Sequence, residues 1–148
     1  MKNLTTLLIS IVFIATFGFG QTTYVPDDNF EQALIDLGYD DVLDDYVLTD
    51  SISGVISLDV STKEISDLTG IEAFTALTFL RCENNELTSL DVSANTALTY
   101  LDCGNNQLTS LDMSANTALV NLVCYSNQLT SLDVSSNTAL TDLSCGHN

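Results

Sequence analysis

The four cysteines of this 148-residue chain are the first residues whose type and spacing suggest chemistry. Cys82, Cys103, Cys124 and Cys145 recur every 21 residues. In-register parallel strands would bring successive cysteines about 4.8 Å apart, within the Cα range that a disulfide allows. Stacked side chains point the same way, however, which leaves their Cβ atoms wider apart than the roughly 3.8 Å of a relaxed disulfide. We predict a buried ladder of reduced thiols in a core, with disulfides as the alternative.

Other catalytic groups are sparse. His147 is the only histidine, and the repeat pattern places no serine beside it, so a Ser-His-Asp triad is not supported. The carboxylates recur as a regular column, not as an isolated pair in differing environments, which acid–base catalysis would need. A straight column of cysteines cannot converge on one metal ion, and no glycine-rich phosphate loop is present. We therefore predict a chain that is not an enzyme and has no catalytic residues.

Two acidic sets offer the oxygen ligands that calcium prefers. Asp91, Asp112 and Asp133 recur one repeat apart, and we interpret this column as a solvated face because salt screens exposed charges. The second set lacks the D-x-D-x-D-G spacing and the final glutamate of an EF-hand loop. Its members are Asp40, Asp41, Asp44, Asp45 and Asp50. We expect no metal ligands and no cofactor, with calcium as the remaining alternative.

A strict repeat of 21 residues, which starts at Leu77, must position these side chains. Each copy reads L-x-x-L-x-C-x-x-N-x-L and then nests a shorter L-x-x-L-x-V-x-x-N. Such a period is typical of a solenoid, in which each turn buries its apolar side against its neighbours. Because both halves alternate, we expect extended segments on two sides of a flattened coil, with little helix. We expect the asparagines to bond backbone groups at the bends; they are Asn85, Asn95, Asn106, Asn116, Asn127 and Asn137.

The pattern resembles secreted bacterial leucine-rich repeat proteins of the nested 21-residue class, over residues 55–148. The first, variant turn contains ISDLTGIEAF at residues 65–74, which is similar to the repeats of internalin-type adhesins. The resemblance implies a leucine-rich repeat solenoid, mainly a parallel β coil with a short, non-repeating helical cap at its N-terminus. We assign residues 21–54 to the cap and residues 55–148 to the repeats. No capping segment follows the last turn, so we expect an array truncated at its C-terminus.

The predicted cap contains one short amphipathic helix. Pro26, Asp27 and Asp28 open it, and Gly38 is a natural stop. Its apolar face, at spacings of three and four, consists of Phe30, Ala33, Leu34 and Leu37. This helix is expected to cover the apolar end of the first repeat.

Residues 1–20 have the layout of a secretory signal peptide, with Lys2, an apolar run and small residues before Gln21. The run is shorter than the about 20 residues of a membrane-spanning helix, so we predict no membrane insertion of the mature chain. Its localisation should be secreted or at the cell surface. The formal net charge is −17, and −18 (−17 − 1) without Lys2, which excludes nucleic acid because phosphate binding needs clustered basic residues.

The outward side chains of the first half-repeat differ from turn to turn, whereas those of the second half are monotonous serine and aspartate. Recognition needs such variety, and aromatic residues and arginine are enriched at interface hot spots. The predicted partner-binding residues are Phe79, Arg81, Tyr100, Asp102, Val123 and Tyr125. The alternative is a set of ordinary exposed aromatics, since scattered surface hydrophobes are normal.

These features predict a non-catalytic extracellular leucine-rich repeat module that binds a protein, or a polysaccharide, for recognition or adhesion. The functional class rests on the resemblance and on the exposed sheet. Two alternatives stay open. The repeats could target a secreted enzyme whose catalytic domain lies beyond residue 148, or form a passive, cation-stiffened surface spacer.

Overall fold

The computed structural model describes residues 20–148, and the predicted signal peptide lies outside them apart from Gly20. The N-terminal elements are the strands β1 (Thr22–Tyr24) and β2 (Tyr46–Leu48) and the helices α1 (Asp28–Asp36) and α2 (Thr49–Ile52). The repeats contribute β3 (Ser57–Asp59), a 3-10 turn η1 (Ile71–Ala73), β4 (Phe79–Arg81), β5 (Tyr100–Asp102), β6 (Asn121–Val123) and β7 (Asp142–Ser144). Within residues 20–148, every helix is too short or too polar to cross a membrane.

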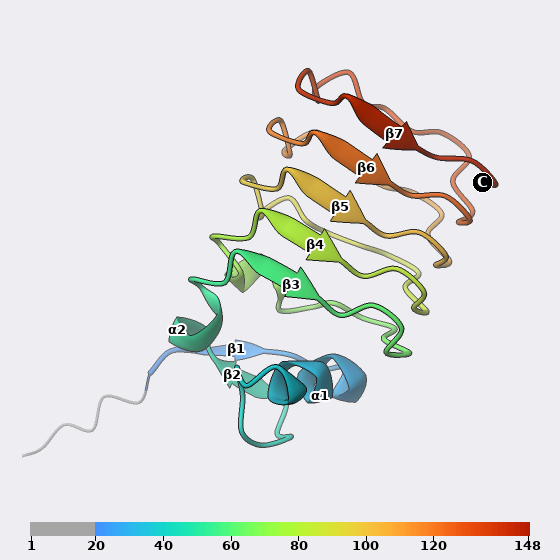
Figure 1. Cartoon of the computed structure of the whole chain (residues 1–148). Helices are drawn as coiled ribbons and strands as arrows, with labels where there is room; N and C mark the ends of the chain where they lie inside the picture. The colour runs from blue at the N-terminus through green and yellow to red at the C-terminus, as the bar shows by residue number, and fades with distance from the viewer. Residues whose placement is uncertain (1–19) are drawn as a thin grey trace, which may run out of the picture.

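The repeats wind into a solenoid with one parallel sheet of five strands, in the order β3-β4-β5-β6-β7 (Figure 1). Strands pair in register, so that Leu58, Leu80 and Leu101 lie beside one another in successive turns. β1 and β2 form a separate antiparallel pair at the N-terminal end. The leucine-rich repeat solenoid predicted from the sequence is therefore confirmed.

The inward side chains of the sheet form the predicted column of leucines and cysteines. Cys82, Cys103 and Cys124 are fully buried, and all four cysteines are free thiols, not disulfides. The prediction of a fully buried ladder is wrong for Cys145, which is exposed. Its turn carries the edge strand β7, where Leu143 is also 44% exposed because a stacked turn covers it on one side only.

The prediction of extended segments on both sides of the coil needs correction. Paired strands form on one side only, and residues 87–92, 108–113 and 129–134 contain none. Asp91 Oδ1 accepts the N–H of Ser93 at 2.9 Å, which bends the chain and removes that donor from any strand pairing. Asn95 N then donates to Val92 O at 3.0 Å, which closes a tight turn. The second side of the solenoid therefore consists of segments that form no paired strands and lead into stacked turns.

The buried asparagine amides connect neighbouring turns, as predicted. Asn106 Nδ2 donates to Cys82 O of the preceding turn at 3.0 Å and to Cys103 O of its own turn at 3.1 Å. Its Oδ1 accepts the buried N–H of Leu87 at 3.0 Å. Asn116 does the same on the other side, donating to two carbonyls at 3.0 Å, although its Oδ1 has no partner among the described residues. These amides satisfy backbone groups at the bends that no strand can pair.

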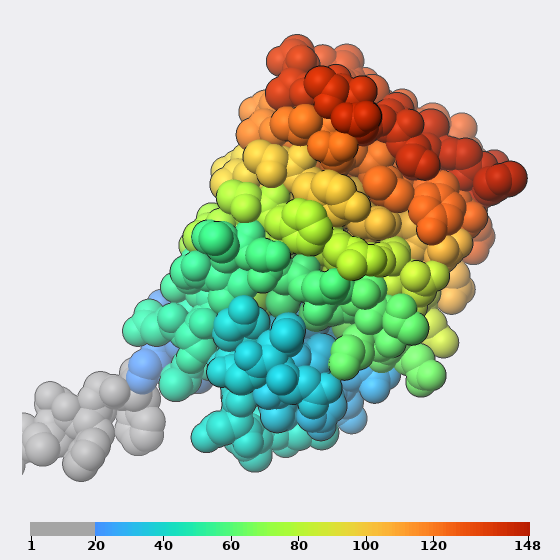
Figure 2. All heavy atoms as spheres, in the orientation of Figure 1, coloured from blue at the N-terminus to red at the C-terminus, as the bar shows by residue number. Residues whose placement is uncertain are grey.

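The N-terminal cap docks on the first turn through one carboxylate. Asp27 Oδ1 accepts the N–H of Asn29 and of Phe30 and so caps α1, while Oδ2 accepts from Ser66 N, Ser66 Oγ and Asp67 N. Burial raises the pKa of Asp27, but these hydrogen bonds outweigh it and leave the pKa below its ordinary value. Figure 2 shows the cap, in blue and teal, closing one end of the stacked turns.

The amphipathic face of α1 is confirmed in three of its four predicted residues. Phe30, Ala33 and Leu34 are buried, and Phe30 packs against Phe74 of the first turn with ring centroids 6.4 Å apart. The prediction is wrong for Leu37, which is 46% exposed because it lies at the C-cap, where the helix ends. Gly38 follows with φ of +80°, the left-handed conformation expected of a helix stop.

Replacing Asn106 with alanine should destabilise the solenoid by about 2–3 kcal/mol, because the buried N–H of Leu87 loses its acceptor. The carbonyls of Cys82 and Cys103 keep another asparagine donor each. Urea unfolding would measure the loss. The control is Gln107→Ala, which changes an exposed side chain at the next position. Equal stability of the two variants would contradict the structural role of the amide.

Alkaline pH should destabilise the fold through the cysteine column. Burial, and then the charge of Cys145, raise the pKa of Cys124 from 9.0 to about 11, and burial also raises the pKa of Cys103. Unfolded thiols ionise first, so stability that is fully present below about pH 9 is lost as the pH rises through the folded-state values. Urea midpoints between pH 7.5 and 10.5 should fall more steeply for the native chain than for a Cys103→Ala, Cys124→Ala variant. Parallel slopes would contradict this account.

Candidate functional site

The six predicted partner-binding residues all lie on or directly after the sheet strands and are all half-buried. β4 supplies Phe79 and Arg81, and β5 supplies Tyr100 and Asp102. β6 supplies Val123. Tyr125 follows β6 by two residues, after the buried cysteine. Side chains alternate along a strand, so the burial of Leu80, Leu101 and Leu122 places the flanking residues on the outer face.

The register brings aromatic residues of adjacent turns into contact. Phe79 pairs with Tyr100 across β4 and β5, and their rings stack with centroids 4.4 Å apart and planes 12° apart. Cross-strand aromatic pairs contribute roughly 0.2–1 kcal/mol each to a sheet. The stack therefore holds two large side chains in place on the surface.

The other flank of the strands carries a charged cluster around Arg81. Its guanidinium donates to Asp59 Oδ2 at 3.1 Å and is also hydrogen-bonded to Glu83. Glu83 is only 6% exposed, and its Oε2 has no partner among the described residues. Asp102 is the register partner of Arg81 on β5. One arginine thus faces three carboxylates, so the cluster is electronegative overall.

Burial and charge shift the ionisation of two residues in this cluster. Burial raises the pKa of Asp102; the N–H of Gly104 and the charge of Arg81 oppose the increase, and the Glu83 charge adds to it. Burial, and then the charge of Asp102, also raise the pKa of Tyr100. The strand face is therefore already partly desolvated before any partner binds.

Tyr125 is held by the turn before it. Its hydroxyl accepts a hydrogen bond from Asn105 Nδ2 at 3.1 Å, and Asn105 Nδ2 also donates to Asn84 Oδ1 at 3.0 Å. The ring covers Gly104 so closely that a Cβ there would lie 2.8 Å from Tyr125 Cε1. The absence of a side chain at Gly104 thus leaves room for the Tyr125 ring.

The structure thus gathers the predicted residues into two contact groups and adds three that the sequence reasoning missed. Phe79, Tyr100 and the Arg81 cluster form one group on β4 and β5, and Val123 lies beside it on β6 as the register partner of Asp102. Tyr125, just after β6, forms a second group with Gly104 and Asn105 of the loop after β5. The missed residues are Asp59, Glu83 and Asn105. Asp59 was accessible from the sequence, because it lies 22 residues before Arg81 and the first turn is 22 residues long.

Few side chains on the described surface have the types that catalysis uses. His147 is exposed with φ of +59° and occupies the repeat position of Asn84, Asn105 and Ser126, which have φ between 52° and 57°. Its place is therefore a turn position that recurs in every repeat. Shallow depressions lie on the opposite face and are lined by exposed serines and aspartates around Leu90, including Ser89, Asp91, Ser110 and Asp112.

The acidic column predicted on that opposite face caps turns. Asp112 Oδ1 accepts the N–H of Ser114 at 2.9 Å, and the hydrogen bonds from Ser114 lower the pKa of Asp112. Among residues 20–148, one group of three carboxylates comes close enough to share a metal ion, and it lies in the cap: Asp28, Glu31 and Asp45. Of the acidic set predicted at residues 40–50, only Asp45 belongs to it.

Comparison with known proteins identifies the repeats. Residues 75–116 match the family described as "Leucine Rich repeats (2 copies)". Internalin J of Listeria monocytogenes serotype 4b is 42% identical over 84 residues, which are 54% of this chain and 9% of Internalin J. The solved structure described as "Functional domain of InlJ from Listeria monocytogenes includes a cysteine ladder" superposes with a TM-score of 0.75 at 43% identity.

That superposition covers 84% of this chain and 28% of the InlJ chain. The structure of an internalin, InlF, from L. monocytogenes has a TM-score of 0.72 at 24% identity, and covers 83% of this chain and 37% of its own; it shows the fold alone. The chain is therefore similar to less than a third of the solved InlJ chain. It is an internalin-like leucine-rich repeat protein close to InlJ over the residues that match.

Replacing Gly104 with alanine should displace the Tyr125 ring and break its hydrogen bond to Asn105, at a cost of about 1–3 kcal/mol for overpacking. Near-ultraviolet circular dichroism and urea unfolding would detect the change. The matched control is Gly54→Ala, because no atom lies within 4 Å of a Cβ at that position. Similar spectra and stabilities for both variants would show that Gly104 does not seat the tyrosine.

Proposed function

We propose that this internalin-like chain is a non-catalytic extracellular module that binds a protein partner through the outer face of β4, β5 and β6. The module would be secreted or displayed at the cell surface after removal of the signal peptide. Its contact residues are the six predicted from the sequence: Phe79, Arg81, Tyr100, Asp102, Val123 and Tyr125. They are joined by Asp59 and Glu83, which complete the charged cluster.

The observation that carries the proposal is the pre-ordering of large side chains on this face. Phe79 and Tyr100 are stacked at 4.4 Å, and Tyr125 is hydrogen-bonded and seated on Gly104. Binding costs free energy to immobilise side chains, about 0.5–1.5 kcal/mol for each rotamer-rich group. Aromatic groups that are already held lose less freedom on binding and offer a large apolar contact, which favours this face over the exposed serines opposite.

The charge of the same face favours a partner with basic groups. Asp59, Glu83 and Asp102 surround the single Arg81, and complementary potentials guide association and exclude wrong partners. A protein surface with lysine or arginine around an apolar contact would match this arrangement. Among polysaccharides, a neutral or cationic chain could stack on the aromatic rings, whereas an anionic one would be repelled.

The likeness to InlJ supports a binding module built on a rigid repeat array. The solved InlJ structure is described as a functional domain with a cysteine ladder. Here Cys82, Cys103 and Cys124 form the same kind of column behind the strands that carry the contact residues. Close packing of small thiols lets the strands keep one register, so the outer residues hold fixed positions relative to one another.

An Arg81→Ala, Tyr100→Ala, Tyr125→Ala variant should bind its partner at least tenfold more weakly, because it loses the held aromatic groups and the arginine. The measurement is binding of the purified chain to arrays of extracellular protein domains and of glycans, followed by affinity determination for each hit.

The control for this experiment changes the opposite face, as Ser89→Ala, Ser110→Ala, Ser131→Ala, since all three serines are exposed. The control should bind like the native chain, and both variants should remain folded by circular dichroism. Affinity unchanged in the β4–β6 variant, or reduced equally in the control, would contradict the proposed binding face.

A further inference from the structure

Glu31 is a buried carboxylate that the protein leaves half satisfied. It lies on α1 with no exposed surface. Its Oε1 accepts the N–H of Asp44 and the N–H of Tyr46, both at 3.0 Å. Its Oε2 is also buried and has no hydrogen-bond partner among the described residues. A buried carboxylate with only one of its two oxygens hydrogen-bonded is costly, and a positive group beside Oε2 would offset this cost.

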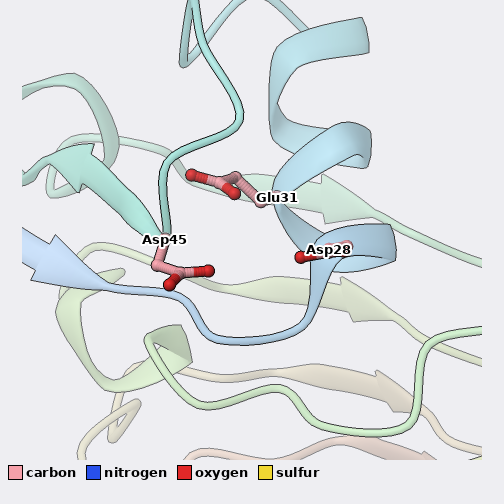
Figure 3. Close-up of side chains that lie close together, drawn as sticks. All are labelled: Asp28, Glu31 and Asp45. Atoms are coloured by element: carbon pink, nitrogen blue, oxygen red, sulfur yellow. The ribbon is translucent and has the colours of Figure 1, made fainter.

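Two further carboxylates form a close group with Glu31. Asp40 lies outside this group, although its Oδ2 is also buried without a partner among the described residues, and burial and then the charge of Glu31 raise its pKa. Asp28 precedes Glu31 by three residues on α1, so the helix places both on one face. Asp45 comes from the loop before β2, where its carbonyl accepts the N–H of Val25 at 2.8 Å. One oxygen from each residue lies within 4.8 Å of the others. Figure 3 shows the three side chains directed into a common space between α1 and the loop.

The basic side chains of the described residues are bound elsewhere. Lys63 pairs with Asp36 at 3.2 Å, and Arg81 pairs with Asp59 and Glu83 on the sheet. Hydrogen bonds to Glu31 come only from backbone N–H groups, and neither Asp28 nor Asp45 has a cationic partner. The charge of these three carboxylates is therefore not balanced within the described part of the chain.

We propose that Asp28, Glu31 and Asp45 bind a divalent cation of the calcium type. Oxygens that coordinate one calcium ion at 2.3–2.6 Å lie up to about 5 Å apart, which matches the spacing of this group. The donors are hard oxygens only, without histidine or thiolate, which favours calcium or magnesium over zinc. Magnesium demands a near-ideal octahedron at 2.0–2.1 Å, whereas calcium accepts a flexible shell of oxygens, so three carboxylates from a helix and a loop favour calcium.

The site supplies three protein ligands, and water must complete the coordination, since Asp28 and Asp45 are exposed. A cage of this kind corresponds to the affinity of extracellular calcium modules, with a Kd of about 10⁻⁴–10⁻³ M. The ion would join the first turn of α1 to the loop before β2, and it would neutralise the buried Glu31. It would therefore stiffen the cap that covers the first repeat. This role is separate from partner binding on β4–β6.

The test uses the chain from residue 21, treated with chelator and kept reduced. Calcium at ten times its Kd should stabilise the folded state about 11-fold relative to the unfolded state, and so raise the Tm by several degrees. Isothermal titration should show one site. An Asp28→Asn, Asp45→Asn variant should lose both signals while remaining folded, because both side chains are exposed.

Two further variants make the outcome specific. Glu31→Gln removes the buried charge and should abolish the calcium response without lowering the Tm of the metal-free chain. Asp41→Asn changes an exposed carboxylate outside the group and should respond like the native chain. No Tm shift in millimolar calcium, a shift retained by the Asp28→Asn, Asp45→Asn variant, or an equal shift with magnesium or with salt of matched ionic strength would overturn the proposal.

Discussion

The structure depends on the hydrogen bonds by which each asparagine amide connects one turn to the next. A solenoid must reverse its chain at every bend, and each bend leaves buried N–H and C=O groups that strands cannot pair. The side chain of Asn106 donates to at least two carbonyls and accepts one N–H, and the side chains of Asn85 and Asn127 make matching bonds in the adjacent turns. Without these amides, buried backbone groups at each bend would lose their hydrogen-bond partners.

This constraint also decides which face of the solenoid is available for binding. The first half of each repeat pairs as a strand, so its alternate side chains stand on a regular surface with neighbours about 4.8 Å away. Such proximity makes the stack of Phe79 on Tyr100 and the ion pair of Arg81 with Asp59 possible. The second half bends around its own aspartates, and its exposed serines gain no such cross-turn contacts. Side chains that are held by cross-turn contacts and also differ from turn to turn therefore occur on one face only.

The repeat itself could be predicted from the sequence because a 21-residue period sets which residues stack. Leu80, Cys103 and Asn106 followed from position alone, and so did the outward placement of Tyr100. The unpaired second side could not be predicted from alternation, because the turn made by Asp91 and Ser93 competes with strand pairing. Contacts within the non-repeating cap could not be predicted from the sequence either. Glu31 meets Asp45 across 14 residues (45 − 31) of non-repeating cap, and no spacing rule indicates that pair.

The cap and the repeats satisfy their buried polar groups by different means. A repeat satisfies its buried polar groups with copies of itself, since each turn supplies the amide that its neighbour needs. The cap has no copy, so single carboxylates must serve several elements. Asp27 binds both α1 and the first turn, and Glu31 binds the loop before β2. A carboxylate brings charge where an amide does not. The cap therefore combines the strongest docking contacts with an unbalanced buried charge, which explains why the ion site we propose lies there and not along the repeats.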